Sequence, residues 1–478
     1  MKLTFWGAAR QVTGSMYLLD IDDYKILVDC GSDMERSKNG EDSAEKINLY
    51  GLFPFEASEL DLVIVTHAHI DHTGKLPNLL KDGYEGQILC TSPTFYLSQL
   101  LLHDAALLNM KKLKRLQGDS RKKQKRRDFS KTIVGELYSE KNVVETLEQF
   151  VTIAFNHRFK VNKNIYLTFI PAGHLLGAAY VLLEINENGT KKTICFSGDI
   201  GRKNYPLLPD PEQVPQVDYL VCESTYGNRN HTFKGNREEG LAEIIKQTCI
   251  DMPGRLIIPA FSVGRTQALL YILNKLYSEK GFPHIRVFAD SPMAYQSTKV
   301  YQNFSKQLNE EAQDFQSKHA SLFDFENLIY VENLKQSKMI KNYTEPCIII
   351  SSSGMIQGGR VEQHIMDNIQ NPYCTVLMVG YASEGTLGYE LTHGLKVIKT
   401  QNGKELAVLA NIVNIDAFSG HGDKDDLTDF VKYQDASKLK QLFLIHGEYG
   451  SMQDFKLHLE NEGYQNVTIP HKGQSFDL

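Results

Sequence analysis

A chain of 478 residues is too long for one ordinary hydrophobic core, because single cores stop growing near about 250 to 300 residues, so we expect two or three domains. The composition, 42% hydrophobic and 23% charged, excludes a disordered or fibrous protein, and the net charge of −6 excludes a nucleic-acid binder that works by overall charge alone. No apolar stretch is long enough for a signal peptide or a membrane span, and the seven cysteines form no CxxC pair, which predicts a cytoplasmic protein with reduced thiols and no membrane contact.

Short apolar and β-branched runs predict buried strands in the first half of the chain, each ending in Gly, Asp, His or Ser. These runs are residues 24–29, 62–66, 165–170, 194–197 and 219–222. Between them, apolar residues at spacings of three and four predict a helix over 95–116. The pattern is typical of the α/β class.

The pattern changes at about residue 228. Helices predicted at 238–249 and 266–277 alternate with strands predicted at 255–259, 285–289 and 347–351. This alternation indicates a second domain with a parallel sheet. The last part of the chain returns to strand, loop and helix and carries two more histidines next to glycines.

A basic segment covers residues 111–127, which contain ten Lys or Arg and one Asp. Charge runs usually face water, so one interpretation is a solvated helix end and loop. The other is a contact with nucleic acid, since clustered Lys and Arg can neutralise phosphates even on an acidic protein.

The strongest motif directly follows the predicted strand 62–66 and contains His67, His69, Asp71 and His72. Residues two apart at a strand end point to the same side, so His67 and His69 can bind one metal ion, and Asp71 and His72 can reach a second. A structural zinc site is closed by four ligands and more often uses cysteine. The His/Asp composition therefore favours a catalytic site.

Two further segments offer single ligands. His174 follows a predicted strand in FIPAGHLLGAAY, and Asp199 ends another in ICFSGDIG. Taken alone, each would be read as a core histidine or a turn aspartate. Beside the HxHxDH motif, both become candidate metal ligands.

These motifs in this order resemble the metallo-β-lactamase superfamily, with Asp29 in ILVDCG as its first acidic motif. Glu223 in VCESTYG, His421 in FSGHGD and His446 in FLIHGE are similar to the β-CASP nucleases within it, as are PAFSVGRTQALLYIL and SSSGMIQGGR. The resemblance implies a four-layer αββα fold with an inserted α/β β-CASP domain. It places the metallo-β-lactamase domain at 1–227 and 396–478, the β-CASP domain at 228–395, and the active site in the cleft between them.

The resemblance also assigns roles to these residues. One zinc ion would be bound by His67, His69 and His174, a second by Asp71, His72 and His446, and Asp199 would bridge them; Mn²⁺ or Fe²⁺ would suit the same ligands. The catalytic set would then be His421, Glu223, Asp71 and Asp199. In the mechanism that the resemblance implies, a hydroxide shared by the metals would attack phosphorus. His421 would act as general acid, and Glu223 would orient the ring of His421. Asp29 would orient ligand loops, and Ser419, Ser353 and Gly354 would hold substrate phosphate.

The expected function is that of an endoribonuclease that cleaves single-stranded RNA. RNA-processing members of the family carry histidine at the last motif, and this chain has His446 there. The short chain after His446 favours cleavage at internal positions. A DNA nuclease of the same family, a small-molecule hydrolase acting on a lactam, lactone or thioester, and a non-catalytic binding module are the alternatives. The sequence is compatible with a homodimer and does not decide the oligomeric state.

Overall fold

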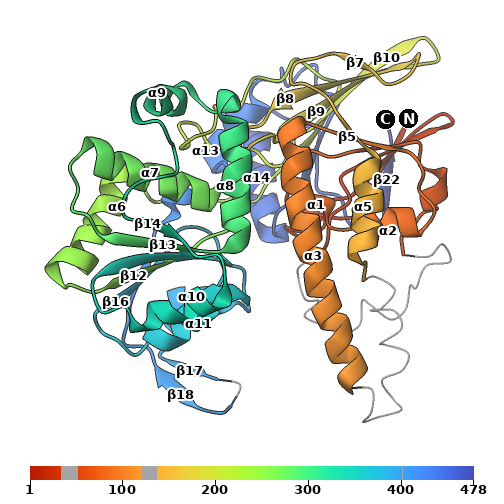
Figure 1. The fold of residues 1–478 in the computed structure, drawn as a ribbon. Helices are drawn as coiled ribbons and strands as arrows, with labels where there is room; N and C mark the ends of the chain where they lie inside the picture. Colours follow the sequence, from red (N-terminus) through yellow and green to blue (C-terminus); the bar gives the residue numbers. More distant parts are fainter. Residues whose placement is uncertain (34–51, 120–136, 401) are drawn as a thin grey trace. The chain divides into compact units, whose positions relative to one another are not determined.

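The computed structural model describes residues 1–33, 52–119, 137–400 and 402–478 (Figure 1). The chain folds into two compact units, the first formed by Met1–Lys203, Asp210–Asn230 and His421–Leu478 and the second by Asn204–Pro209 and His231–Gly420. The domain boundaries expected after residues 227 and 395 stay a prediction. Within the described ranges, no helix combines the length and the apolar character needed to cross a membrane.

The first unit contains two seven-stranded sheets. In spatial order, the first sheet consists of β22 (Gln474–Asp477), β1 (Lys2–Phe5), β2 (Tyr17–Ile21), β3 (Tyr24–Val28), β4 (Leu62–Ile64), β5 (Gln87–Cys90) and β6 (Phe150–Thr152). The second consists of β21 (Val467–Thr468), β20 (Gln441–Ile445), β11 (Tyr219–Glu223), β10 (Thr190–Phe196), β9 (Ala179–Glu187), β8 (Ile165–Pro171) and β7 (Phe159–Lys160). The C-terminal segment therefore adds strands to both sheets and completes the unit.

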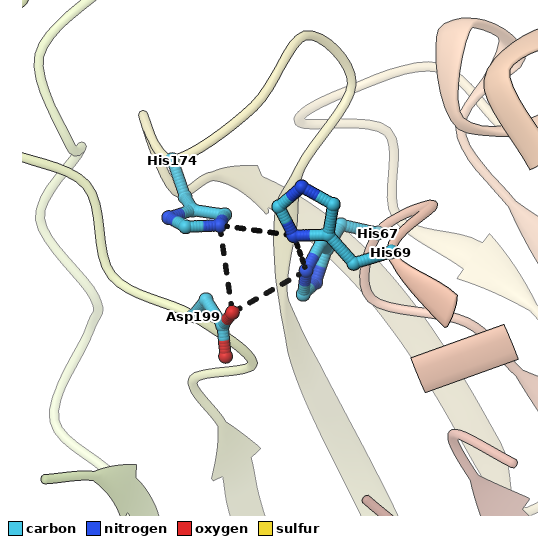
Figure 2. Close-up of side chains that lie close together, drawn as sticks. All are labelled: His67, His69, His174 and Asp199. Carbon is cyan, nitrogen blue, oxygen red and sulfur yellow. Dashed lines mark hydrogen bonds and ion pairs between the residues drawn. The ribbon is translucent and has the colours of Figure 1, made fainter. Parts of the chain in front are cut away.

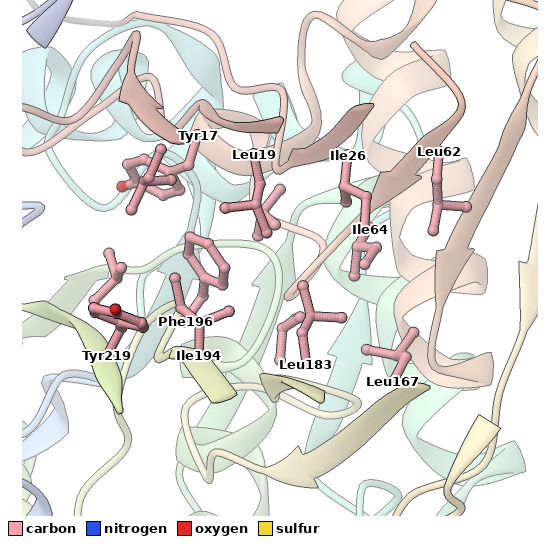
Figure 3. Packing of buried hydrophobic residues seen from close by; sticks show 14 of the residues in the cluster. Tyr17, Leu19, Ile26, Leu62, Ile64, Leu167, Leu183, Ile194, Phe196 and Tyr219 are labelled. Carbon is pink, nitrogen blue, oxygen red and sulfur yellow. The ribbon is translucent and has the colours of Figure 1, made fainter. Parts of the chain in front are cut away.

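The central strands are apolar on both faces because each sheet is covered on both sides. In β3, Ile26 and Val28 point into the core between the sheets, whereas Leu27 points to the opposite face. Figure 3 shows this core, in which Leu183 of β9 is buried with Ile64 of the first sheet. Burial between two sheets holds their strand ends in fixed positions.

Helices cover the outer face of each sheet of the first unit. On the first sheet they are α1 (Ile70–Thr73), α2 (Leu76–Lys81), α3 (Ser92–Asp119) and α5 (Glu140–Glu148), and on the second α13 (Lys424–Val431) and α14 (Tyr449–Asn461). Leu76 and Leu79 of α2 pack on the face that carries Leu27. On the other side, the rings of Tyr180 and Phe430 lie 4.7 Å apart. The predicted four-layer αββα arrangement is confirmed.

The second unit contains a six-stranded parallel sheet. Its strands in spatial order are β14 (Leu328–Tyr330), β13 (Arg286–Asp290), β15 (Cys347–Ser351), β12 (Arg255–Pro259), β16 (Cys374–Met378) and β19 (Asn411–Asn414). Its helices are α6 (Arg237–Ile245), α7 (Arg265–Glu279), α8 (Pro292–Asn303), α9 (Glu310–His319), α10 (Leu334–Met339), α11 (Gly359–Asn368) and α12 (Leu387–Thr392), and β17 (Val397–Lys399) pairs with β18 (Glu405–Ala407). The predicted second α/β domain with a parallel sheet is confirmed.

The basic segment 111–127 begins as the last turns of α3. Lys111, Lys112 and Lys114 are exposed there, as a solvated helix end requires. Residues 120–127 lie outside the described residues, so the alternative interpretation, a contact with nucleic acid, stays untested.

We expect the core between the two sheets to carry much of the stability of the first unit. Leu183 is fully buried and pairs across the sheet with Leu167 and Ile194. Leu183→Ala should therefore lower the free energy of unfolding by about 2–5 kcal/mol, through lost burial and the cavity left behind. The measurement is urea unfolding followed by the fluorescence of Trp6, the one tryptophan of the chain, which lies in this unit.

Leu457→Ala is the matched control, because this leucine of the same unit is 60% exposed. Its substitution should change the free energy of unfolding by no more than about 0.5 kcal/mol. Equal effects of the two substitutions would contradict the assignment of the core.

Candidate functional site

The candidate ligands lie at the carboxyl ends of strands in the first unit. His67 follows β4, His174 follows β8, Asp199 follows β10 and His446 directly follows β20. Strands β10, β11 and β20 run parallel to one another, as β3 does to β4, so their carboxyl ends meet at the same edges. All seven predicted ligands come together there, in groups whose donor atoms lie within 4.8 Å of one another.

The first group consists of His67, His69, His174 and Asp199 (Figure 2). Nδ1 of His69 lies 3.0 Å from Nε2 of His67 and 3.3 Å from Nε2 of His174. Oδ2 of Asp199 lies 3.4 Å from Nε2 of both His67 and His174. Three ring nitrogens and one carboxylate oxygen thus face a common centre.

The second group consists of Asp71, His72 and His446. Nε2 of His446 lies 3.4 Å from Oδ2 of Asp71, and Nε2 of His72 lies 3.9 Å from the same oxygen. The other oxygen of Asp199, Oδ1, lies 3.2 Å from Nε2 of His72 and 3.5 Å from Nε2 of His446. Asp199 therefore faces one group with each of its two oxygens.

The donor atoms fit metal ions. Oδ1 of Asp199 is buried and accepts no hydrogen bond from the described residues, which leaves its lone pairs for a cation. Imidazole nitrogens and carboxylate oxygens without thiolates suit Zn²⁺, Mn²⁺ or Fe²⁺. The side chains of Asp71 and His421 remain 18% and 21% exposed, so water can reach the site.

The environment sets the charge of the histidines. Burial lowers the pKa of both His67 and His69, that of His69 to about 4, so both rings are neutral at pH 7 and keep lone pairs for a cation. Burial would also lower the pKa of His72. The negative charges of Asp199 and Asp29 outweigh burial there and raise the pKa of His72 well above its usual value.

The carboxylates show the converse effect. Burial would raise the pKa of Asp71, but His72 and His446 lower it to about 2. Burial likewise acts against ionisation of Asp199, yet His446 and His72 lower the pKa of Asp199 well below its usual value. Both carboxylates are therefore ionised at neutral pH and attract cations.

Asp29 and Thr66 orient two of the rings. Nδ1 of His72 donates to Oδ2 of Asp29 at 2.7 Å, and the hydroxyl of Thr66 donates to the same oxygen at 2.9 Å. The hydroxyl has one proton, which it gives to the carboxylate, so it accepts from Nδ1 of His67 at 3.1 Å. When either ring is neutral, its one proton therefore stays on Nδ1 and Nε2 has a free lone pair, as metal ligation requires.

His421 lies beside the two groups and is held by Glu223. Nδ1 of His421 lies 3.1 and 3.2 Å from the two carboxylate oxygens of Glu223, and its Nε2 lies 3.8 Å from Oδ2 of Asp199. Glu223 is completely buried and also accepts from the backbone N–H of Ile200 at 2.5 Å. Burial would lower the pKa of His421, but Glu223 and Asp199 raise it to about 9, so Nε2 carries a proton at pH 7.

A close backbone approach holds the loop of the second group in place. The N–H of Cys30 donates to the carbonyl of His72, and the N–H of Ser15 donates to the carbonyl of Asp71, both at 2.8 Å. A Cβ on Gly31 would lie 1.6 Å from the carbonyl oxygen of Asp71, so this position accepts only glycine.

The three predicted phosphate-binding residues belong to the second unit. Ser419 is buried, and its N–H donates to the carbonyl of Asp416. The hydroxyl of Ser353 donates to the carbonyl of Gln357 at 3.0 Å, and Gly354 lies against the backbone of Phe261. Their role in binding substrate stays a prediction.

The sequence analysis missed two hydroxyl residues of the site, Thr66 and Thr225. Thr66 directly precedes the HxHxDH motif, and Thr225 lies in the CESTYG motif, where its hydroxyl contacts His446. The position of each threonine beside or within a motif was the signal that could have identified it as a site residue. The partner of each hydroxyl becomes visible only when distant loops are brought together.

Three family models match the chain. They describe the "Metallo-beta-lactamase superfamily" over residues 9–153, the "Beta-Casp domain" over 266–391 and the "Zn-dependent metallo-hydrolase RNA specificity domain" over 405–470. The resemblance inferred from the motifs is confirmed. Together with the converging His and Asp side chains, these matches identify the cluster as a metal site.

Similar proteins cover nearly the whole chain. Ribonuclease TTHA0252 of Thermus thermophilus is 30% identical over 94% of this chain and 93% of its own length. Transcription termination factor FttA of Methanosarcina mazei is 29% identical over 98% of this chain and 71% of its own. Cleavage and polyadenylation specificity factor 73 of Drosophila melanogaster is 29% identical over 95% and 61%. A crystal structure of a protein of unknown function from Enterococcus faecalis V583 shares the fold, with a TM-score of 0.53 and 14% identity over 100% of this chain and 99% of that one.

We expect Glu223 to set the protonation of His421. In the metal-free protein, His421 should titrate with a pKa of about 9, and Glu223→Gln should lower that value, because the amide removes the negative charge that stabilises the imidazolium. Proton NMR of the histidine ring protons across the pH range measures the change. His393→Gln is the control, because it identifies the signals of an exposed histidine and so guards against assigning them to His421. An unchanged titration of His421 in Glu223→Gln would contradict the pairing of His421 with Glu223.

Proposed function

Because the chain belongs to the β-CASP family of the metallo-β-lactamase superfamily, we propose that it is a metal-dependent endoribonuclease that cleaves single-stranded RNA. One observation carries the proposal. Asp199 faces a different ligand group with each oxygen, and a protonated histidine, His421, lies 3.8 Å from it. This arrangement suits hydrolysis of a phosphodiester, which needs both an activated water and a proton donor for the leaving oxygen.

Two zinc ions per chain are the proposed cofactor, and Mn²⁺ or Fe²⁺ would fit the same donors. His67, His69 and His174 would hold the first ion through three ring nitrogens, and Asp71, His72 and His446 the second. Asp199 would contribute one oxygen to each. When bound, such ions act as Lewis acids that lower the pKa of water and stabilise charge on phosphoryl oxygens.

His421 is the proposed general acid. Its Nδ1 donates to Glu223, which fixes the ring so that the protonated Nε2 faces the ligand groups. From there Nε2 gives its proton to the leaving oxygen of the substrate. Glu223 stabilises the imidazolium before transfer and is buried, so water does not compete for its carboxylate.

RNA is the proposed substrate because of the relatives. One of the similar proteins is a ribonuclease, and one matching family model describes an RNA specificity domain. Internal cleavage, single-stranded RNA and phosphate binding by Ser419, Ser353 and Gly354 are parts of the same proposal. A homodimer and a cytoplasmic location stay predictions from the sequence.

Cleavage of end-labelled RNA tests this function. The zinc-loaded protein should cut single-stranded RNA at internal positions, and the double substitution His69→Ala and Asp71→Ala should abolish cutting, because each ligand group loses a donor. Products are resolved by length, beside single-stranded DNA of the same sequence and a chromogenic lactam.

His319→Ala is the matched histidine control, since His319 lies in α9 of the second unit, and it should cut like the parent. Hydrolysis of the lactam without cleavage of either nucleic acid would refute the proposed substrate. Cleavage of DNA in preference to RNA would refute the proposal that RNA is the substrate.

A further inference from the structure

Thr225 makes two hydrogen bonds to the same residue. Its Oγ1 lies 3.0 Å from Nδ1 of His446 and 3.0 Å from the carbonyl oxygen of His446. His446 is buried and adopts a positive φ of 50°, a conformation that non-glycine residues rarely occupy. The ring and the carbonyl of one histidine are thereby tied to a single hydroxyl.

The number of protons decides the direction of both bonds. A carbonyl oxygen can only accept, so the one proton of the Thr225 hydroxyl goes to the carbonyl of His446. The hydroxyl oxygen must then accept from Nδ1, which is therefore the protonated nitrogen of the neutral ring. Nε2 of His446 is left with a free lone pair, and it is the atom that lies 3.4 Å from Asp71 and 3.5 Å from Asp199.

We propose that Thr225 is a positioning residue that fixes His446 in the Nδ1–H tautomer and thereby controls metal binding by the second group. The inference rests on the proposed role of His446 as a metal ligand. The other histidine of that group, His72, already has its Nδ1 fixed by Asp29. Thr225 does the same for His446 with a neutral hydroxyl and no added charge.

The surroundings make this contact rigid. Thr225 follows the carboxyl end of β11, and His446 follows that of β20, its parallel neighbour. The hydroxyl of Ser224 donates to the carbonyl of Ile445 at 2.7 Å and joins the two strand ends. Thr225 therefore has little freedom to turn its hydroxyl away from the ring.

The contact predicts a selective loss of metal affinity. Thr225→Val keeps the shape of the side chain but removes the hydroxyl, so Nδ1 of His446 loses its acceptor and the ring can protonate Nε2 instead. The first group has no hydrogen bond to Thr225 among the described contacts and should be unaffected. Binding of the second metal equivalent should weaken about 10- to 100-fold, the usual effect of removing a group that orients a ligand.

The test is a Co²⁺ titration of the metal-free full-length protein, followed by the absorption of the bound ion and by competition with a chromophoric chelator. The parent should bind two equivalents, Thr225→Val should bind one with the affinity of the parent and the other more weakly, and Thr225→Ser should restore both. Thr146→Val is the matched control, because this buried threonine donates to the carbonyl of Asn142 within α5.

The tautomer is measured separately, by ¹⁵N NMR of the histidine rings in the metal-free protein at a pH where His446 is neutral. Nδ1–H should dominate in the parent and lose its dominance in Thr225→Val. This readout still decides the role of Thr225 if the parent fails to bind two ions, a result that would refute only the proposed metal content. An unchanged tautomer, or equal loss of both metal equivalents together with a lower unfolding temperature, would overturn the inference.

Discussion

The carboxylate of Asp199 is the group on which the site depends, because it is almost completely buried and faces histidines of both ligand groups. A buried charge is strongly destabilising unless opposite charges or cations surround it. The partners of Asp199 come from both sheets of the first unit: His67 and His72 follow β4, and His446 follows β20. The apolar core between those sheets therefore sets the distances between the proposed ligands. The site can form only when this core is packed.

Several residues of the same site have unfavourable backbone conformations. Asp29 and His446 have positive φ values of 59° and 50°, each of which costs about 1–2 kcal/mol for a residue with a Cβ. Gly31 passes so close to the carbonyl of Asp71 that no side chain fits. Such strain persists only where the surrounding structure fixes it. Here parallel strands end on both sides of the site and hold its loops from several directions.

Much of the fold could be predicted from the sequence, because apolar runs and helical spacings report burial locally. Strands Arg255–Pro259 and Cys347–Ser351 were predicted to the residue, whereas the helix expected over 238–249 ends at Ile245 and continues to Asp251 as a π-helical turn that composition does not signal. The HxHxDH ligands were identifiable because they are contiguous. His174 and Asp199 were weak signals until they were set beside that motif. Thr66 was missed because Asp29, which accepts its hydrogen bond, is distant in sequence.

The turn Glu223–Ser224–Thr225 shows how one strand end can serve two functions. Glu223 orients His421, and Thr225, two residues later, orients His446. Between them, the hydroxyl of Ser224 donates to the carbonyl before His446 and fixes β11 against β20. Groups on rigid elements keep their relative positions better than groups on separate loops. The proposed proton donor and a proposed metal ligand are therefore set by the same three residues, and a displacement of this turn would disturb both together.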